Sequence, residues 1–316
     1  MANLKEIRSR IASVKNTRKI TSAMSRIAAA RLRKAQTAME NAREYGKRMA
    51  TITGEILAEL DDAPSHHSLL STNDLSAICY VIVTADRGLC GGFNSSVSRA
   101  TERAIKQLRA EGREVHIITV GRKGRAYLKT YKATSMSHHA APNSPNDVVD
   151  AAQAITTEIM GLHGGTFSTA DVDGDGKPDV GAGPRVGEVR IVYNYFVNVI
   201  TQEVRDERLI PLPMPEPRTG GEEPRAAVAH AIRAFEPDIQ NLLEHLLPTA
   251  LETAVQQALY NSVVSEVASR RGAMDAATNN AMELIAELTL QYNRERQAAI
   301  TKELMEIIGG AEALKG

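Results

Sequence analysis

Aromatic residues are scarce in this 316-residue chain: they make up 4% of it, and Trp is absent. Aromatic side chains supply much of the volume of large cores, so this composition disfavours a single large spherical core. Ala, Leu, Ile, Met and long charged residues dominate instead, which is typical of long helices packed along narrow seams. The length allows two ordinary domains, or one domain with extended helices.

Cysteine is almost absent as well. Cys79 and Cys90 are too few for a disulfide framework and do not form a CxxC pair, so we expect free thiols in a reducing compartment. The sequence contains no apolar run of 18 residues, so no membrane span is predicted. The first residues are basic and amphipathic, as in a transit peptide. Their pattern continues without a break to residue 60, so they are assigned to mature structure.

Net charge is also lacking, because 38 basic and 38 acidic residues cancel. This excludes a globally basic nucleic-acid-binding protein but permits local segregation of charge. Nine basic and no acidic residues lie between positions 8 and 34, whereas twelve acidic and six basic residues lie from position 236 onward. The nine are Arg8, Arg10, Lys15, Arg18, Lys19, Arg26, Arg31, Arg33 and Lys34.

Two interpretations of this basic stretch remain open. It is either a solvated helix face with some attraction to the second helix, or a surface for an acidic partner outside the chain. Nucleic acid is disfavoured as that partner, because residues 1–44 contain no aromatic residue for stacking and no groove-reading motif.

Two long helices are predicted at the ends of the chain. Residues 3–60 contain no Pro, and their apolar residues recur in steps of three and four, which predicts one helix roughly 80 Å long. The same pattern returns from residue 236 to about 308. The simplest arrangement is an antiparallel coiled coil of the two helices.

The middle of the chain predicts an α/β domain with a mainly parallel sheet. Residues 61–73 break the first helix, and residues 205–224, rich in Pro and charge, are interpreted as a linker. Buried strands are expected at 77–84, 115–120 and 189–199, and helices at 95–111, from Gly121 onward and at 147–161. The predicted fold is therefore a long helical coiled coil with an inserted Rossmann-like α/β domain. Its parts are 1–60, 74–204 (with an inserted loop at 164–187), a 205–235 linker and 236–316.

Two glycine-containing turns are candidate nucleotide sites. The loop Asp86–Asn94 and the turn Gly121–Gly124 each lead into a predicted helix, where backbone N–H groups attract anions. Neither matches a dinucleotide or P-loop motif, so structural turns are favoured. Cys90 has no His or acidic partner at a recognisable spacing, which disfavours a nucleophilic role.

Metal binding was considered at two kinds of site. The inserted loop carries Asp171, Asp173, Asp175 and Asp179 at calcium-loop spacing, but Ala182 stands where a bidentate Glu is expected, so a solvated hairpin tip is favoured over calcium. The pairs His66-His67 and His138-His139 are interpreted as surface histidines in polar loops, because further converging ligands are missing. No metal or cofactor is predicted.

Three motifs resemble the γ subunits of bacterial F-type, proton-translocating ATP synthases. They are IASVKNTRKITSAMSRIAAARLRK at 11–34, TADRGLCGGFN at 84–94 and ITKELMEIIGGAEA at 300–313, and they occur in the family's order. The stretch YNRERQ at 292–297 is also similar. The 164–187 insertion departs from the family pattern, and it lacks the Cys pair of the plastid subunits.

The resemblance implies a non-catalytic rotor shaft that turns inside a ring of catalytic and nucleotide-binding subunits and couples proton flow to ATP synthesis or hydrolysis. The implied partners are the α and β subunits of the head, the ε subunit and the membrane c-ring. The implied location is the cytoplasmic side of a bacterial inner membrane, peripheral to it. The implied contacts with the ring are Arg8, Arg10, Lys15, Arg18, Lys19, Met24, Arg296 and Gln297.

The implied signature residues form two further groups. The family loop comprises Asp86, Arg87, Gly88, Cys90, Gly91 and Gly92, and the C-terminal signature comprises Thr301, Glu303, Glu306, Gly310 and Ala311. Two other classes stay open. A generic coiled-coil scaffold would dimerise freely through its terminal helices, and an enzyme using the Asp86–Asn94 loop would bind or turn over nucleotide.

Overall fold

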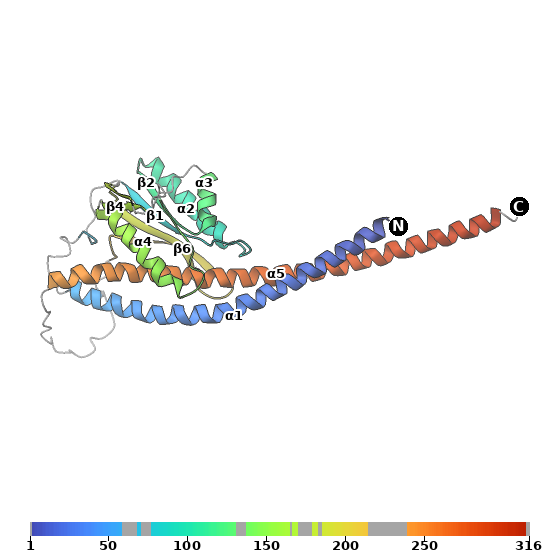
Figure 1. Cartoon of the computed structure of the whole chain (residues 1–316), viewed down its shortest axis with the longest axis horizontal. Coiled ribbons are helices and arrows are strands. Elements are labelled where there is room, and N and C mark those ends of the chain that lie inside the picture. The colour runs from blue at the N-terminus through green and yellow to red at the C-terminus, as the bar shows by residue number, and fades with distance from the viewer. Residues whose placement is uncertain are drawn as a thin grey trace, which may run out of the picture. The chain divides into compact units, whose positions relative to one another are not determined.

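The computed structural model describes residues 2–58, 68–70, 77–130, 137–164, 166–169, 179–182, 185–213 and 239–313 (Figure 1). The chain divides into two compact units. The first contains residues 1–30 and 270–316, and the second contains residues 31–269. Two long helices, α1 (Ala2–Ala58) and α5 (Ile239–Ala313), contribute to both units.

The second unit contains a five-stranded sheet in the order β3-β2-β1-β6-β7. Strands β1 (Ile78–Val83), β2 (Val115–Val120), β3 (Ser137–His139) and β6 (Glu188–Phe196) pair in parallel with one another. Helices α2 (Phe93–Ala110), α3 (Arg122–Thr130) and α4 (Asp147–Gly164) connect them. The predicted α/β domain with a mainly parallel sheet is confirmed.

The last strand of the sheet corrects the sequence analysis. Strand β7 (Gln202–Ile210) pairs antiparallel with β6, although residues 205–210 were assigned to a linker. Charged residues misled that assignment, since the run from Arg205 to Arg208 is charged throughout and lies in an edge strand whose burial is partial. An edge strand of an antiparallel pair keeps much of its surface in water and so lacks the apolar run of a central strand.

The sheet is covered on both faces, with α2 and α3 on one side and α4 and α5 on the other (Figure 1). On the first side, Ile78, Tyr80 and Ile82 from β1 pack with Val97 and Ile105 from α2. Strand β1 is buried along its whole length. Burial on both faces explains why its sequence is a continuous apolar run rather than an alternating one.

Within the second unit, α5 is a core helix. Nearly every residue from Val263 to Ala268 is buried, whereas a surface helix would be buried along one stripe only. Polar side chains of α5 bond to the end of β6 and the start of β7. Ser265 Oγ donates to the Asn194 carbonyl over 3.1 Å, and Ser269 Oγ donates to Gln202 Oε1 over 2.8 Å.

Within the first unit, α1 and α5 pair through a narrow antiparallel seam. Thr278 Oγ1 donates to Thr21 Oγ1 over 2.7 Å, and Ser25 Oγ donates to Asp275 Oδ1 over 2.5 Å, so residue numbers rise along α1 as they fall along α5. On α5 the buried residues Met274, Ala281 and Leu288 are seven apart. This spacing is that of a coiled-coil seam and confirms the predicted antiparallel coiled coil.

The inserted loop contains a two-stranded antiparallel hairpin, β4 (Thr166–Thr169) and β5 (Asp179–Ala182). A hairpin at this position agrees with the favoured interpretation of the insertion. Asp171, Asp173 and Asp175 lie outside the described residues, so the calcium alternative, which the sequence analysis disfavours, is not tested.

The buried phenol of Tyr80 should make the free energy of unfolding fall as the pH becomes alkaline. Burial, helped by the neighbouring Asp206 charge, raises the pKa of Tyr80 from 10.0 to about 12. The neutral phenol is therefore favoured in the folded state, and its contribution is present below pH 10 and lost as the pH rises through 12.

We expect Tyr80→Phe to reduce the fall in unfolding free energy between about pH 10 and 12, measured by urea denaturation. Tyr45→Phe is the matched control, because Tyr45 is 52% exposed. Equal pH slopes for the Tyr80→Phe protein and the unmodified chain would contradict this assignment.

Candidate functional site: a basic helix surface and the Asp86–Asn94 loop

The nine basic residues between positions 8 and 34 of α1 are all exposed. Among the described residues, none of them forms an ion pair. Arg8, Arg10, Lys15, Arg18, Lys19 and Arg26 belong to the first unit. We call these six exposed cations the basic surface.

The acidic residues of α5 do not neutralise the basic surface. Asp275, which faces α1, accepts from Ser25 Oγ and pairs with Arg271 of its own helix at 3.8 Å. Glu306 pairs with Lys302, again within α5. No ion pair joins α1 to α5 among the described residues, so attraction between the helices does not account for the segregated charge.

The C-terminal end of α5 is exposed over its last described turns. Counting 18 residues from the Thr21–Thr278 contact in both helices places Arg296 level with Asn3, so within this unit the signature from Thr301 onward extends past the start of α1 (Figure 1). Ile300, Leu304, Met305, Ile307 and Ile308 are consequently between 49% and 70% exposed. An exposed apolar cluster on this scale is typical of a surface that a partner covers.

The predicted contact residues therefore belong to one unit. Arg296 and Gln297 are exposed on α5, and Met24 is half-buried on α1. Of the C-terminal signature, Thr301, Glu303, Glu306 and Gly310 are exposed, and Ala311 ends the signature in the last turn of α5.

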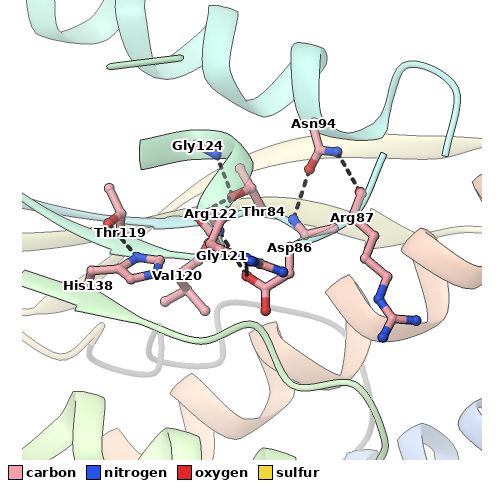
Figure 2. Close-up of polar contacts among 11 residues, drawn as sticks. Thr84, Asp86, Arg87, Asn94, Thr119, Val120, Gly121, Arg122, Gly124 and His138 are labelled. Atoms are coloured by element: carbon pink, nitrogen blue, oxygen red, sulfur yellow. Dashed lines mark hydrogen bonds and ion pairs between the residues drawn. The ribbon is translucent and has the colours of Figure 1, made fainter. Parts of the chain in front are cut away.

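The Asp86–Asn94 loop, by contrast, is part of the α/β domain and bonds to the N-terminus of α3 (Figure 2). The first three N–H groups of α3 each have an acceptor in the segment that follows β1. Arg122 N donates to Asp86 Oδ1 (2.9 Å), Lys123 N to the Ala85 carbonyl (3.2 Å), and Gly124 N to Thr84 Oγ1 (2.9 Å). These donors are the groups that would otherwise bind a phosphate. The structural interpretation of the Gly121–Gly124 turn is therefore favoured over nucleotide binding.

Asn94 closes the same loop from the other side. Its Oδ1 accepts from Ala85 N over 2.8 Å, and its Nδ2 donates to Cys90 Sγ over 3.2 Å. Cys90 is buried, and its thiol donates to the Arg87 carbonyl over 3.7 Å. These bonds, together with the bond from Gly124 N to Thr84, give Asn94 and Thr84 structural roles that the sequence analysis did not assign. The only signal was their position next to a strand end and a helix start.

The glycines of the loop differ from one another in backbone geometry. Gly91 has a φ of 56°, as a tight turn requires, but Gly88 and Gly92 have no positive φ. Leu89 adopts a φ of 65° instead, and its side chain is 65% exposed. This conformation costs a non-glycine residue about 1–2 kcal/mol, so the loop presents Leu89 to solvent at the expense of local strain.

The second histidine pair corrects another prediction. His138 and His139 lie in strand β3 and are half-buried, rather than in a polar loop. His139 Nε2 lies 2.6 Å from Glu158 Oε2, and His138 Nδ1 lies 3.1 Å from Thr119 Oγ1. Burial and the nearby Arg125 charge lower the pKa of His138. His66 and His67 lie outside the described residues.

The chemistry of the described residues is limited. No cluster of three or more His, Cys, Asp or Glu side chains suited to a metal ion occurs among them. Burial raises the pKa of the Cys79 thiol, which opposes formation of a nucleophilic thiolate. Nor does any helix in the described ranges have the length and apolarity to span a membrane.

The chain combines two helices paired as an antiparallel coiled coil, an α/β domain and an exposed basic surface. These features define its class, which is that of a coiled-coil stalk protein. Comparison with known proteins specifies the family. The sequence matches the family model described as ATP synthase over residues 3–314. It is 40% identical over 315 residues to the ATP synthase gamma chain of Phenylobacterium zucineum, covering 99% of this chain and 100% of that one. The gamma chain of Rhodospirillum rubrum is 39% identical over 316 residues, with 99% and 100% coverage. The chain therefore belongs to the ATP synthase gamma chain family.

Solved structures agree on the fold. A chain of the Euglena gracilis mitochondrial ATP synthase superposes with a TM-score of 0.63 at 17% identity, covering 99% of this chain and 95% of that one. A chain of the Tetrahymena thermophila mitochondrial ATP synthase central stalk and c-ring gives a TM-score of 0.55 at 24% identity, with 82% and 99% coverage.

A side chain at position 121 should not be tolerated, because Gly121 lies against the backbone of Thr84. Gly121 has a φ of 90°, and a Cβ there would overlap the backbone of Thr84. We expect Gly121→Ala to lower the unfolding free energy by about 2–4 kcal/mol, from positive φ and overpacking together.

Gly112→Ala is the matched control for this substitution. Gly112 has a φ of 76°, but nothing lies within 4 Å of its Cβ position. Strain alone should then cost about 1–2 kcal/mol. Urea denaturation of both full-length variants measures the difference, and equal losses would show that the contact with Thr84 contributes nothing.

Proposed function

We propose that this chain is the non-catalytic central rotor subunit of an F-type ATP synthase and couples proton flow to ATP synthesis and hydrolysis by turning inside the catalytic ring. The observation that carries the proposal is the basic surface, six exposed cations that no described acidic residue neutralises. Membership of the gamma chain family supports the same role.

The rotor role needs a stiff body that touches several partners in turn. A two-stranded antiparallel coiled coil resists bending because its seam residues interlock along the axis. The basic surface would face acidic segments of the α and β subunits, where opposite charges accelerate association and fix orientation. The exposed apolar end of α5 would be covered by an apolar collar in the same ring.

The remaining partners are assigned to the α/β domain. We place the c-ring and the ε subunit at this domain and the linker that follows β7. The complex would lie on the cytoplasmic side of a bacterial inner membrane, with this chain peripheral to it.

Reconstitution tests the role of the basic surface. The full chain is mixed with the α and β subunits of its own organism, and co-purification and cooperative ATP hydrolysis are measured. We expect a stoichiometric complex. Reversing Arg8, Arg10, Lys15 and Arg18 to Glu together should weaken its assembly at low salt by about tenfold or more, because like charges would then oppose each other.

A matched variant reverses four exposed cations on the α2–α3 face, namely Arg99, Arg103, Arg109 and Lys129. This variant should assemble like the unmodified chain. Equal assembly by both variants would remove the basic surface from the interface. A chain that stays out of the ring and dimerises through its helices would replace the rotor with the scaffold hypothesis.

A further inference from the structure

A cavity of about 760 Å³ lies within the second unit between α1, α5 and the β6–β7 pair. Its size is within the range of about 300–1,000 Å³ that is usual for small-molecule sites. The basic surface and the Asp86–Asn94 loop contribute no residue to its wall.

The cavity is elongated along the two helices. Gln257 Nε2 donates to the Ala42 carbonyl over 3.3 Å, which sets Gln257 of α5 beside Gly46 of α1. The wall then follows α1 from Gly46 to Leu57 and α5 back from Gln257 to Leu247. At 1.5 Å per residue, these stretches make the cavity roughly 16 Å long.

One end of the cavity is apolar and buried. Leu57 and Leu247 are 5% and 0% exposed there. Leu212 also lines the cavity, and it belongs to the same end because β7 starts beside Ser269 and runs toward the first turns of α5. Its backbone N–H donates to the Leu69 carbonyl over 2.8 Å, which brings Leu70, another lining residue, to the same wall.

The other end is polar and open. Lys47 and Ala50 are exposed there, so this end meets solvent. The ion pair of Lys47 with Glu44 (3.0 Å) joins two side chains that are each 66% exposed, and such pairs contribute little. The acidic side chain at the wall, Glu207, already accepts from Tyr193 Oη over 2.9 Å and pairs with Arg205. Lys47 can therefore exchange Glu44 for an anion at the mouth, and Arg190 and Arg208 add positive charge to the cavity wall.

The wall also contains an unsatisfied polar group. Thr53 is 8% exposed, and its hydroxyl has no hydrogen-bond partner among the described residues. Folded proteins leave few buried polar groups unpaired. A water or ligand atom admitted to the cavity, after rotation of the Thr53 side chain, would provide the missing partner.

We propose that this cavity binds a single-chain carboxylate amphiphile, a fatty acid in chemical class, with its alkyl chain against the leucines and its carboxylate at Lys47. The elongated shape, the buried apolar end and the exposed cationic mouth each match one part of such a molecule. Binding would bridge α1 and α5 and stabilise their pairing within this unit. This proposal does not depend on the rotor role.

Calorimetric titration of the full chain with sodium decanoate, below the concentration at which it forms micelles, tests the proposal. We expect saturable binding at one site. Ala250→Phe fills the half-buried wall of α5 and should weaken binding by at least tenfold, as an occupied pocket excludes the chain. Ala110→Phe, at an exposed position of α2, is the control and should bind like the unmodified chain.

The head group is tested separately. Lys47→Gln should weaken decanoate by about threefold but leave 1-decanol unaffected, and Lys129→Gln should change neither. If Ala250→Phe loses its helical circular dichroism, Ala254→Phe replaces it. Absence of saturable binding to the unmodified chain would overturn the proposal. So would undiminished binding by the folded phenylalanine variant, or equal loss of decanoate and decanol with Lys47→Gln.

Discussion

The antiparallel pairing of α1 with α5 is the contact on which the rest of the structure depends. In the first unit it is a narrow seam, in which Thr21 and Ser25 bond to Thr278 and Asp275. In the second unit α5 is buried nearly all round from Val263 to Ala268, where it packs in the core of the α/β domain. One helix therefore takes part in a coiled coil and in a globular core. A protein that must be stiff, and must also carry a domain, needs such a shared element.

The division of charge follows from the same arrangement. A two-stranded seam buries only a stripe of each helix, so the remaining surface of α1 is free to carry cations. Those cations have no described acidic partner in the chain, and the last turns of α5 expose apolar side chains beyond the seam. The Asp86–Asn94 loop behaves in the opposite way, since its polar groups bond within the domain to Ala85 and to the start of α3. Thr84, just before the loop, also bonds to the start of α3. Apart from the exposed Leu89, this loop is organised for internal structure, whereas the helix pair leaves its cations and terminal apolar side chains exposed.

Much of the fold could be predicted from periodicity alone. The 3–60 helix, the strands at 77–84 and 115–120, and the helix at 147–161 correspond to α1, β1, β2 and α4, because long seams and doubly buried strands leave strong patterns. Strand β7 could not be predicted from periodicity, because the sequence of an exposed edge strand resembles that of a charged loop. The positive φ of Leu89 and the bonds of Thr84 to α3 were equally hidden, because they depend on residues distant in sequence meeting at one edge of the sheet. The basic stretch of α1 could be identified from the sequence. That it forms no ion pair with α5 among the described residues could be established only from the structure.

Rotation is the property that separates a rotor from a static scaffold, and it is directly measurable. Both native cysteines are buried, so a single cysteine introduced by Lys106→Cys on the exposed face of α2 would be labelled selectively. A bead attached there, with the catalytic head immobilised, reports the motion of this chain during ATP hydrolysis. The account predicts stepwise rotation in one direction that stops when ATP is removed. A bead that stays still while the same assembled complexes hydrolyse ATP would contradict it.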